Sequence, residues 1–129
     1  MSQIRDMVAH LLEIIDGDTI KVDCDLGFDI WKKNVKVRLA GIDTPELITL
    51  EGQKTKKWLE QTLGVRQTVV IRTYTHRVDK YGRVLGDLFL DGKCLNEEMM
   101  ALGLARSYKG KGPKPWSASP PPLIAGPVG

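Results

Sequence analysis

Apolar and polar residues alternate in short stretches along most of the chain, which is the pattern of half-buried β-strands. In residues 34–40 the apolar side chains fall on alternate positions, and Lys36 and Arg38 between them are expected to face outward. Residues 25–33 interrupt the pattern and are expected to form a long hairpin loop. The strands predicted in this way cover residues 8–15, 19–24, 34–40, 67–74 and 84–90.

Turn residues and helical periodicity mark the segments between these strands. Asp16-Gly17 predicts a tight turn between the first two strands. An apolar stripe at helical spacing predicts a helix over residues 51–63, with Gly64 as its C-terminal stop. A second short helix is predicted over residues 96–103, with Asn96 as its N-cap.

Strands with a helix between the third and the fourth are typical of an OB-type barrel. The sequence therefore predicts a mainly β protein with helices (α+β), namely an OB-fold five-stranded β-barrel with two short helices. A chain of 129 residues and 14.4 kDa suffices for one domain. This domain is expected to cover residues 1–109, followed by a flexible tail rich in glycine and proline over residues 110–129.

The net charge is +3, and it is concentrated in Arg106, Lys109, Lys111 and Lys114. The body before Arg106 is slightly acidic, so binding of a polyanion must depend on a local cluster and on the tail. No apolar run approaches the roughly 18 residues that span a bilayer, and the N-terminus lacks the residue order of a signal peptide. A cytoplasmic location is favoured unless a leader was removed, and no membrane partner is expected.

The cysteines and histidines indicate neither a metal site nor a nucleophile. Cys24 and Cys94 fit no metal-ligand spacing and are expected to be free thiols rather than a disulfide. His10 and His76 fit no arrangement for nucleophilic catalysis.

Three polar clusters carry the candidate chemistry, and the first is Asp16-Gly17-Asp18-Thr19. A hairpin turn alone could explain it, because Asp-Gly strongly favours such a turn. The turn needs only one aspartate, however, and Asp18 opens a strand, where aspartate is disfavoured. A further role for the Asp18 carboxylate is therefore open.

The second cluster is Arg38 followed by Asp43-Thr44-Pro45-Glu46. It could simply be an outward arginine and a strand terminator, since proline supplies no N–H to a sheet. Alternatively, its carboxylate and carbonyl oxygens suit a hard cation, Ca²⁺ or Mg²⁺. The absence of nearby histidine and cysteine in the sequence argues against zinc.

The third cluster, Asp79-Lys80-Tyr81-Gly82-Arg83, is either a solvated charged turn or a phosphate-binding loop. Taken together, the three clusters supply what phosphodiester hydrolysis needs. A divalent cation and two arginines stabilise the negative charge of the transition state, and a carboxylate positions or deprotonates water.

These motifs and their order are similar to those of the staphylococcal nuclease (thermonuclease) family over about residues 8–108. The resemblance implies one bound Ca²⁺, held by the carboxylates of Asp18 and Asp43 and by the main-chain carbonyl of Thr44. It also implies that Asp16 does not bind the ion itself but orients the residues that do.

The resemblance assigns the catalytic and substrate-binding roles as well. Arg38 and Arg83 would hold the scissile phosphate, and Glu46 would orient the attacking water; whether Glu46 also takes the proton stays open. Substrate contacts beyond the scissile phosphate are implied for Lys80, Tyr81 and Tyr108, the first two at a neighbouring phosphate and the last at a base.

The expected function is that of a monomeric, calcium-dependent nuclease of the thermonuclease type. It would hydrolyse phosphodiester bonds of DNA and RNA with little sequence specificity, favour single strands, and leave 3′-phosphate ends. The alternative is a non-catalytic OB-fold nucleic-acid-binding module. A structural module that uses the proline-rich tail is a third possibility, although the tail lacks a convincing docking pattern.

The chain also departs from the family pattern in three places. The segment between Glu46 and the first helix is several residues shorter than in the staphylococcal enzyme, and the hairpin over residues 25–33 is longer. The family's third helix, after Tyr108, is expected to be missing.

Overall fold

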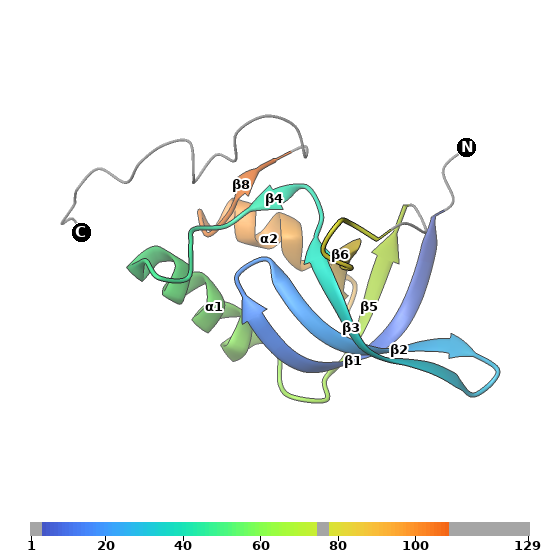
Figure 1. Cartoon of the computed structure of the whole chain (residues 1–129). Helices are drawn as coiled ribbons and strands as arrows, with labels where there is room; N and C mark the ends of the chain where they lie inside the picture. The colour runs from blue at the N-terminus through green and yellow to red at the C-terminus, as the bar shows by residue number, and fades with distance from the viewer. Residues whose placement is uncertain (1–3, 75–77, 109–129) are drawn as a thin grey trace.

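The computed structural model describes residues 4–74 and 78–108, and its strands and helices are shown in Figure 1. The strands are β1 (Arg5–Asp16), β2 (Thr19–Gly27), β3 (Ile30–Leu39), β4 (Ile42–Asp43), β5 (Thr68–Thr73), β6 (Val84–Leu90), β7 (Lys93–Cys94) and β8 (Arg106–Ser107). The helices are α1 (Leu50–Thr62) and α2 (Leu95–Ala101). None of the helices in this part of the chain is long and apolar enough to cross a membrane.

The main sheet closes on itself. Its strands follow the order β3-β2-β1-β5-β6-β7, and β3 also pairs in parallel with β6, so that β1, β2, β3, β5 and β6 form a ring. A separate two-stranded sheet joins β4 to β8. The prediction of an OB-type five-stranded barrel with two short helices is confirmed.

The predicted hairpin loop over residues 25–33 is wrong, because β2 and β3 continue through it to a two-residue turn. Phe28 and Asp29 form this turn, and both have positive φ (57° and 61°), as a type I′ turn requires. Figure 1 shows β2 and β3 extending away from the helices as a long hairpin. Trp31 therefore lies on a strand, where its ring packs against that of His10 at 5.0 Å between centroids.

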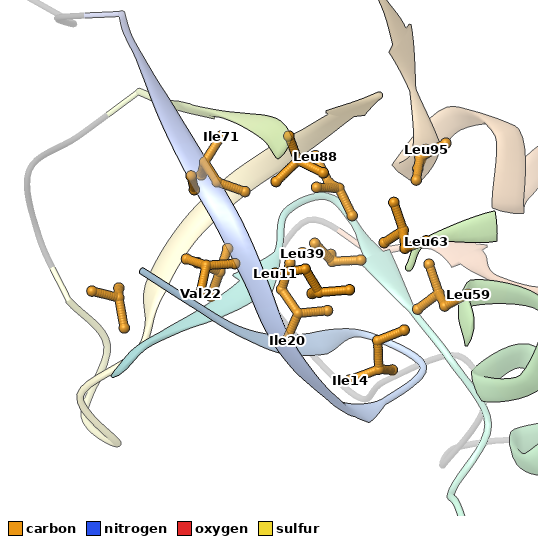
Figure 2. Packing of buried hydrophobic residues seen from close by; sticks show 14 of the residues in the cluster. Leu11, Ile14, Ile20, Val22, Leu39, Leu59, Leu63, Ile71, Leu88 and Leu95 are labelled. Carbon is orange, nitrogen blue, oxygen red and sulfur yellow. The ribbon is translucent and has the colours of Figure 1, made fainter. Parts of the chain in front are cut away.

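The core fills the barrel and its contact with the helices (Figure 2). Leu59 and Leu63 of the α1 region are 0% and 3% exposed, and α1 packs against β1. Burying a leucine side chain contributes about 1.5–3 kcal/mol. Cys24 is buried among the core residues, and Cys24 and Cys94 are both free thiols, as predicted.

Both helices begin one residue earlier than predicted; α1 ends just before Gly64, as predicted, whereas the predicted N-cap of α2 is wrong. The chain leaves α1 in an extended conformation at Leu63 (φ −118°), so Gly64 is not a left-handed cap. Helix α2 has Cys94 at its N-cap, while Asn96 lies inside the helix and is 2% exposed. A buried amide needs hydrogen-bond partners, and Asn96 finds them on the barrel instead of on its own helix.

Asn96 bridges the parallel seam of the barrel. Its Nδ2 donates to the carbonyl oxygen of Ala40 at 2.8 Å, and its Oδ1 accepts from the N–H of Leu88 at 2.9 Å. Ala40 follows β3 and Leu88 belongs to β6, so one side chain satisfies main-chain groups on both strands. The side chain thereby ties α2 to the seam.

Asn96→Ala should lower the free energy of unfolding by about 2–4 kcal/mol, because it leaves the Leu88 N–H and the Ala40 carbonyl buried without this partner. Urea unfolding measures the change. The control is Glu97→Ala at an exposed position of the same helix, with an expected effect below about 1 kcal/mol. Equal midpoints for Asn96→Ala and the wild type would refute the bridging role.

Candidate active site

The first and second polar clusters meet at one end of the barrel. The carbonyl oxygen of Asp18 accepts a hydrogen bond from the N–H of Leu39 at 2.8 Å, which aligns the β1–β2 turn with the end of β3. The Asp18 carboxylate in turn accepts from the N–H of Thr44 at 3.4 Å. The residues predicted to hold a cation, Asp18, Asp43 and Thr44, thus come from segments that lie against one another.

Gly17 permits this close packing. A Cβ at this position would lie 2.8 Å from the Thr44 hydroxyl oxygen and 2.8 Å from the Thr55 methyl carbon. Both distances are below ordinary van der Waals contact, so any side chain would push the turn away from Thr44. The glycine is required here for space, in addition to its suitability for the turn.

Arg38 is buried, and the prediction that it faces outward into solvent is wrong. It does lie opposite the core face of β3, but it is only 6% exposed. The chain turns at Gly41 (φ +75°), and the carbonyl oxygens on either side of this turn are close to the Arg38 side chain. The guanidinium donates to the carbonyl oxygens of Leu39 (2.7 Å) and Ile42 (2.8 Å).

These contacts hold the Arg38 guanidinium beside the residues that were predicted to hold a cation. Its Nη2 lies 3.5 Å from Oδ2 of Asp18. A guanidinium has five N–H donors, of which the two carbonyls take two. The group is therefore oriented and still has donors for an anion.

Negative charge is crowded in the β1–β2 turn. Asp16 Oδ1 accepts a hydrogen bond from the N–H of Asp18 at 3.1 Å. Burial, and then the neighbouring Asp18 carboxyl, raise the pKa of Asp16 to about 6, against a weaker opposing effect of Arg38. Asp43, in β4, is 3% exposed and is paired in register with Arg106 of β8.

The chemistry of these donors fits a hard cation. Carboxylate and carbonyl oxygens are the ligands that Ca²⁺ prefers, and the crowded carboxyls favour positive charge. Within residues 4–74 and 78–108, no group of three or more His, Cys, Asp or Glu side chains could hold a metal ion. Calcium takes about six to eight oxygen ligands. The two aspartates and the Thr44 carbonyl would supply some of them, and water or substrate would supply the others.

Glu46 stands at the edge of this region. It follows the buried Pro45 and is exposed. In the part of the chain that the structure describes, its carboxylate makes no hydrogen bond or ion pair, whereas its main-chain carbonyl is held by Thr49.

The third cluster is a turn built around Asp79. The Asp79 carboxylate accepts from Nε of Arg83 at 2.7 Å and from the N–H groups of Tyr81 and Arg83, each at 2.9 Å. Burial alone would raise the pKa of Asp79, but the hydrogen bonds from Arg83 and Tyr81 hold it below its usual value. The Lys80 ammonium and the Arg83 guanidinium lie 5.3 Å and 5.2 Å from the centroid of the Tyr81 ring.

The parallel seam brings the start of β6, which Arg83 directly precedes, to the strand that carries Arg38. Val84 pairs with Val37, so extending the register by one residue sets Arg83 opposite Lys36. Lys36 and Arg38 are two residues apart and share a face of β3, a separation of about 6.5 Å along a strand. Arg38 thus lies in β3, and Arg83 directly precedes the neighbouring strand β6.

Tyr108 lies beside the bend after β3. Its N–H donates to the carbonyl oxygen of Gly41 at 2.8 Å, and it directly follows β8. The structure thus brings Tyr108 to the same end of the barrel as Arg38. The predicted tail over residues 110–129, the basic residues Lys109, Lys111 and Lys114, and His76 lie outside the described residues.

Three residues that matter for this geometry were not singled out in the sequence. Thr49 caps α1, while Gly52 and Thr55 lie on the side of the helix that faces Glu46 and Gly17. A threonine directly before a helical stretch, with Glu51 in the first turn, was an available capping signal. The close contacts of Gly52 and Thr55 depend on tertiary packing and had no such signal.

A groove of about 490 Å³ lies elsewhere, with Arg72 and Phe89 among its lining residues. None of the predicted site residues lines it. The Arg72 guanidinium is bound by Asp6 at 2.7 Å and 3.0 Å and lies 4.8 Å from the Phe89 ring centroid. This cation is paired within the fold, and the groove adds nothing to the candidate site.

The fold and these residues define an OB-type barrel protein with carboxylates and arginines gathered at one end. The chain belongs to the family of staphylococcal nuclease homologues, whose model matches residues 36–118. Arg38, Asp43, Glu46 and Arg83 lie within the matched residues, and the turn with Asp18 lies before them.

Individual relatives extend the similarity across most of the chain. A probable staphylococcal-like nuclease, CAN1, of Oryza sativa subsp. japonica is 33% identical over 95 residues, which are 74% of this chain. An uncharacterized endonuclease of Escherichia coli is 33% identical over 108 residues, or 81% of the chain. The thermonuclease of Staphylococcus hyicus is 29% identical over 113 residues, or 83% of the chain. The matches span 28% of the rice protein and 63% of each of the other two, less than two thirds of each.

Asp16→Asn should stabilise the protein at neutral pH when no divalent cation is present. The pKa of Asp16 is about 6 in the folded state and near 3.8 in the unfolded state, so the folded state binds this proton more tightly. The carboxyl of Asp16 therefore opposes folding increasingly as the pH rises from about 4 to about 6. Asparagine keeps an acceptor for Asp18 and cannot ionise.

Urea unfolding between about pH 4 and pH 7 measures this difference. The variant should be more stable by about 1–2 kcal/mol at pH 7, after allowance for solvent screening, and equal to the wild type near pH 4. A difference that does not change with pH would contradict the raised pKa.

Proposed function

We propose that this chain is a calcium-dependent nuclease that hydrolyses phosphodiester bonds of DNA and RNA with little sequence specificity. We further propose that it favours single strands and leaves 3′-phosphate ends. The observation that carries the proposal is the meeting of Asp18, Thr44 and Arg38 at one end of the barrel, in a chain of the staphylococcal nuclease homologue family. The nuclease names of relatives that extend beyond this chain give it further support.

Asp18, Asp43 and the Thr44 carbonyl would hold the calcium ion. Bound there, the ion would stabilise negative charge on phosphate oxygens and favour ionisation of water. Asp16 supports the site from the turn, because its carboxylate fixes the N–H of Asp18. The carbonyl oxygen of Asp18 accepts from the N–H of Leu39, and its carboxylate accepts from the N–H of Thr44, so the ligand oxygens are arranged before any ion arrives.

Arg38 of β3 and Arg83, which directly precedes β6, would bind the scissile phosphate. Arg38 is oriented by two carbonyl oxygens and Arg83 by Asp79, so neither needs to lose much side-chain freedom when the phosphate binds. Planar guanidinium groups match pairs of phosphate oxygens and stabilise the charge that develops on them.

The remaining assigned residues act on water and on the rest of the substrate. Glu46 would orient the attacking water with its exposed carboxylate. Lys80 and Tyr81 would contact a neighbouring phosphate from the Asp79 turn, and Tyr108 would pack against a base beside Gly41. A base that is free of its partner strand can reach such an aromatic ring, which supports the preference for single strands.

Cleavage of labelled single-stranded DNA by the purified protein, with calcium and with a calcium chelator, tests the proposal. Cleavage should require calcium, and calcium should raise the unfolding temperature of the wild type but not that of Asp43→Asn. Undiminished cleavage after thorough chelation would refute the metal assignment. Binding of the DNA without cleavage in calcium would favour the non-catalytic module.

Arg38→Lys should reduce turnover of single-stranded DNA by about 10²–10³-fold at saturating calcium, because lysine cannot form the two-pronged contact with phosphate. It should also lower stability by about 1–3 kcal/mol, since the carbonyl oxygens of Leu39 and Ile42 lose well-placed donors. Turnover is therefore measured well below the unfolding temperature of the variant.

Lys32→Ala provides a matched control for Arg38→Lys. Lys32 is an exposed residue of the same strand, and its replacement should leave turnover within about twofold of the wild type. Wild-type turnover in folded Arg38→Lys would refute a catalytic role for Arg38.

A further inference from the structure

Thr49 connects Glu46 directly to the start of helix α1. The Glu46 carbonyl oxygen accepts two hydrogen bonds from Thr49, one from its N–H at 2.9 Å and one from its hydroxyl at 2.7 Å. The same hydroxyl oxygen accepts from the N–H of Gly52 at 3.0 Å. One side chain therefore caps the helix and holds the peptide that carries the Glu46 carboxylate.

Gly52 brings the first turn of the helix against that peptide. A Cβ on Gly52 would collide with the Glu46 carbonyl oxygen, and it would lie 2.6 Å from the Glu46 carbonyl carbon and 2.9 Å from the Pro45 oxygen. The backbone of Gly52 is not in the left-handed region, so its lack of a side chain matters for space alone. The Pro45–Glu46 segment is thus hydrogen-bonded to Thr49 and packed closely against Gly52.

The helix that receives these contacts is itself fixed to the rest of the fold. The Thr55 hydroxyl lies 3.1 Å from the carbonyl oxygens of both Glu51 and Leu104 and is 1% exposed. Leu59, one turn further on, is fully buried. The Thr55 methyl group faces Gly17, next to the turn that carries Asp18. Helix α1 therefore contacts both the cation-binding turn and the Glu46 peptide.

Among the described residues, the Glu46 carboxylate has no hydrogen-bond or ion-pair partner. Its position therefore depends on the contacts of the Glu46 main chain. A carboxylate that directs a water molecule must be held in place, since a misplacement of about 1 Å can cost about 10²-fold in rate. The anchoring of residue 46 to the helix is the contact that meets this need.

We propose that Thr49 is a positioning residue for Glu46, acting through the hydrogen bond from its hydroxyl to the Glu46 carbonyl, with Gly52 as the packing surface behind it. This inference rests on the proposed function, because it assumes that Glu46 directs the attacking water. It also gives a structural consequence of the short connection between Glu46 and α1: the helix cap itself holds the catalytic peptide.

Three substitutions at Thr49 separate anchoring from capping. Thr49→Ser keeps both hydrogen bonds of the hydroxyl, and Thr49→Val removes both. Thr49→Asp keeps an acceptor for Gly52 and remains a good N-cap, but it cannot donate to the Glu46 carbonyl. We expect kcat to fall about 10–100-fold in Thr49→Val and Thr49→Asp and to stay within about threefold in Thr49→Ser. The unfolding temperature should fall in Thr49→Val alone.

Thr62→Val is the matched control. Its hydroxyl donates to the Trp58 carbonyl oxygen at 2.7 Å at the other end of the same helix. This variant loses a comparable hydrogen bond far along α1 from Glu46, so its kcat should remain that of the wild type. A loss of kcat in Thr62→Val as large as in Thr49→Val would show that general weakening of α1 suffices, and it would overturn the positioning role.

A double-mutant cycle with Glu46→Gln distinguishes failure of the inference from failure of the proposed function. Glu46→Gln alone should lower kcat by about 10²–10⁴-fold. If Thr49 acts through Glu46, Thr49→Val should cause little further loss in the Glu46→Gln background. Wild-type turnover in Glu46→Gln would refute the proposed role of Glu46, whereas an undiminished effect of Thr49→Val in that background would refute positioning.

Hydrogen exchange supplies a readout that does not need activity. Amides of residues 46–50 should exchange faster in Thr49→Asp than in the wild type, although the global stability of the two proteins is the same. Exchange in Thr49→Asp at wild-type rates would overturn the anchoring, even in a protein that cleaves no nucleic acid.

Discussion

Parallel pairing between β3 and β6 is the constraint on which the candidate site depends. The two strands are far apart in sequence, and their pairing closes the barrel and places the start of β6, which Arg83 directly precedes, against the strand that carries Arg38. The same seam continues beyond β3, where the N–H of Ala40 donates to Gly86. The Asn96 side chain binds the Ala40 carbonyl oxygen and the Leu88 N–H beside this seam. A buried amide in α2 therefore supports the placement of the arginines.

The end of the barrel that carries the site combines crowded carboxyl groups and a buried guanidinium in one small volume. Burial and neighbouring charge raise the pKa of Asp16, while the guanidinium of Arg38 is almost wholly buried. Such a cluster does little for stability, because removing charges from water is costly. The fold tolerates it because each group has defined partners: main-chain carbonyls for Arg38 and main-chain N–H groups for Asp16 and Asp18. Perturbed and tightly held groups of this kind are typical of sites that bind charged ligands.

The sequence predicted the elements whose signals are local and missed those that tertiary contacts decide. An apolar run between a polar turn and Asp91-Gly92 gave the exact bounds of β6, and Asp-Gly marked the β1–β2 turn. Periodicity also placed Arg38 on the face opposite Val37, but it could not show that the guanidinium is buried and bound by the carbonyl oxygens of Leu39 and Ile42. The turn at Phe28 and Asp29 lacks the usual Asn-Gly signal, and Asn96 resembles a helix cap until its partners on other strands are known.

The two predicted functions of the carboxylates require different kinds of support, and the fold provides them separately. A cation is attracted from several directions, so Asp18 and Asp43 need only be brought together, which the close packing at Gly17 and the pairing of β4 with β8 support. A carboxylate that directs water must instead remain exposed, and an exposed side chain has few contacts of its own to hold it. Its position must then come from the backbone. The hydroxyl of Thr49 and the close approach of Gly52 attach that backbone to a helix whose other contacts are buried in the core, so that the freedom of the Glu46 side chain is limited to its own rotations.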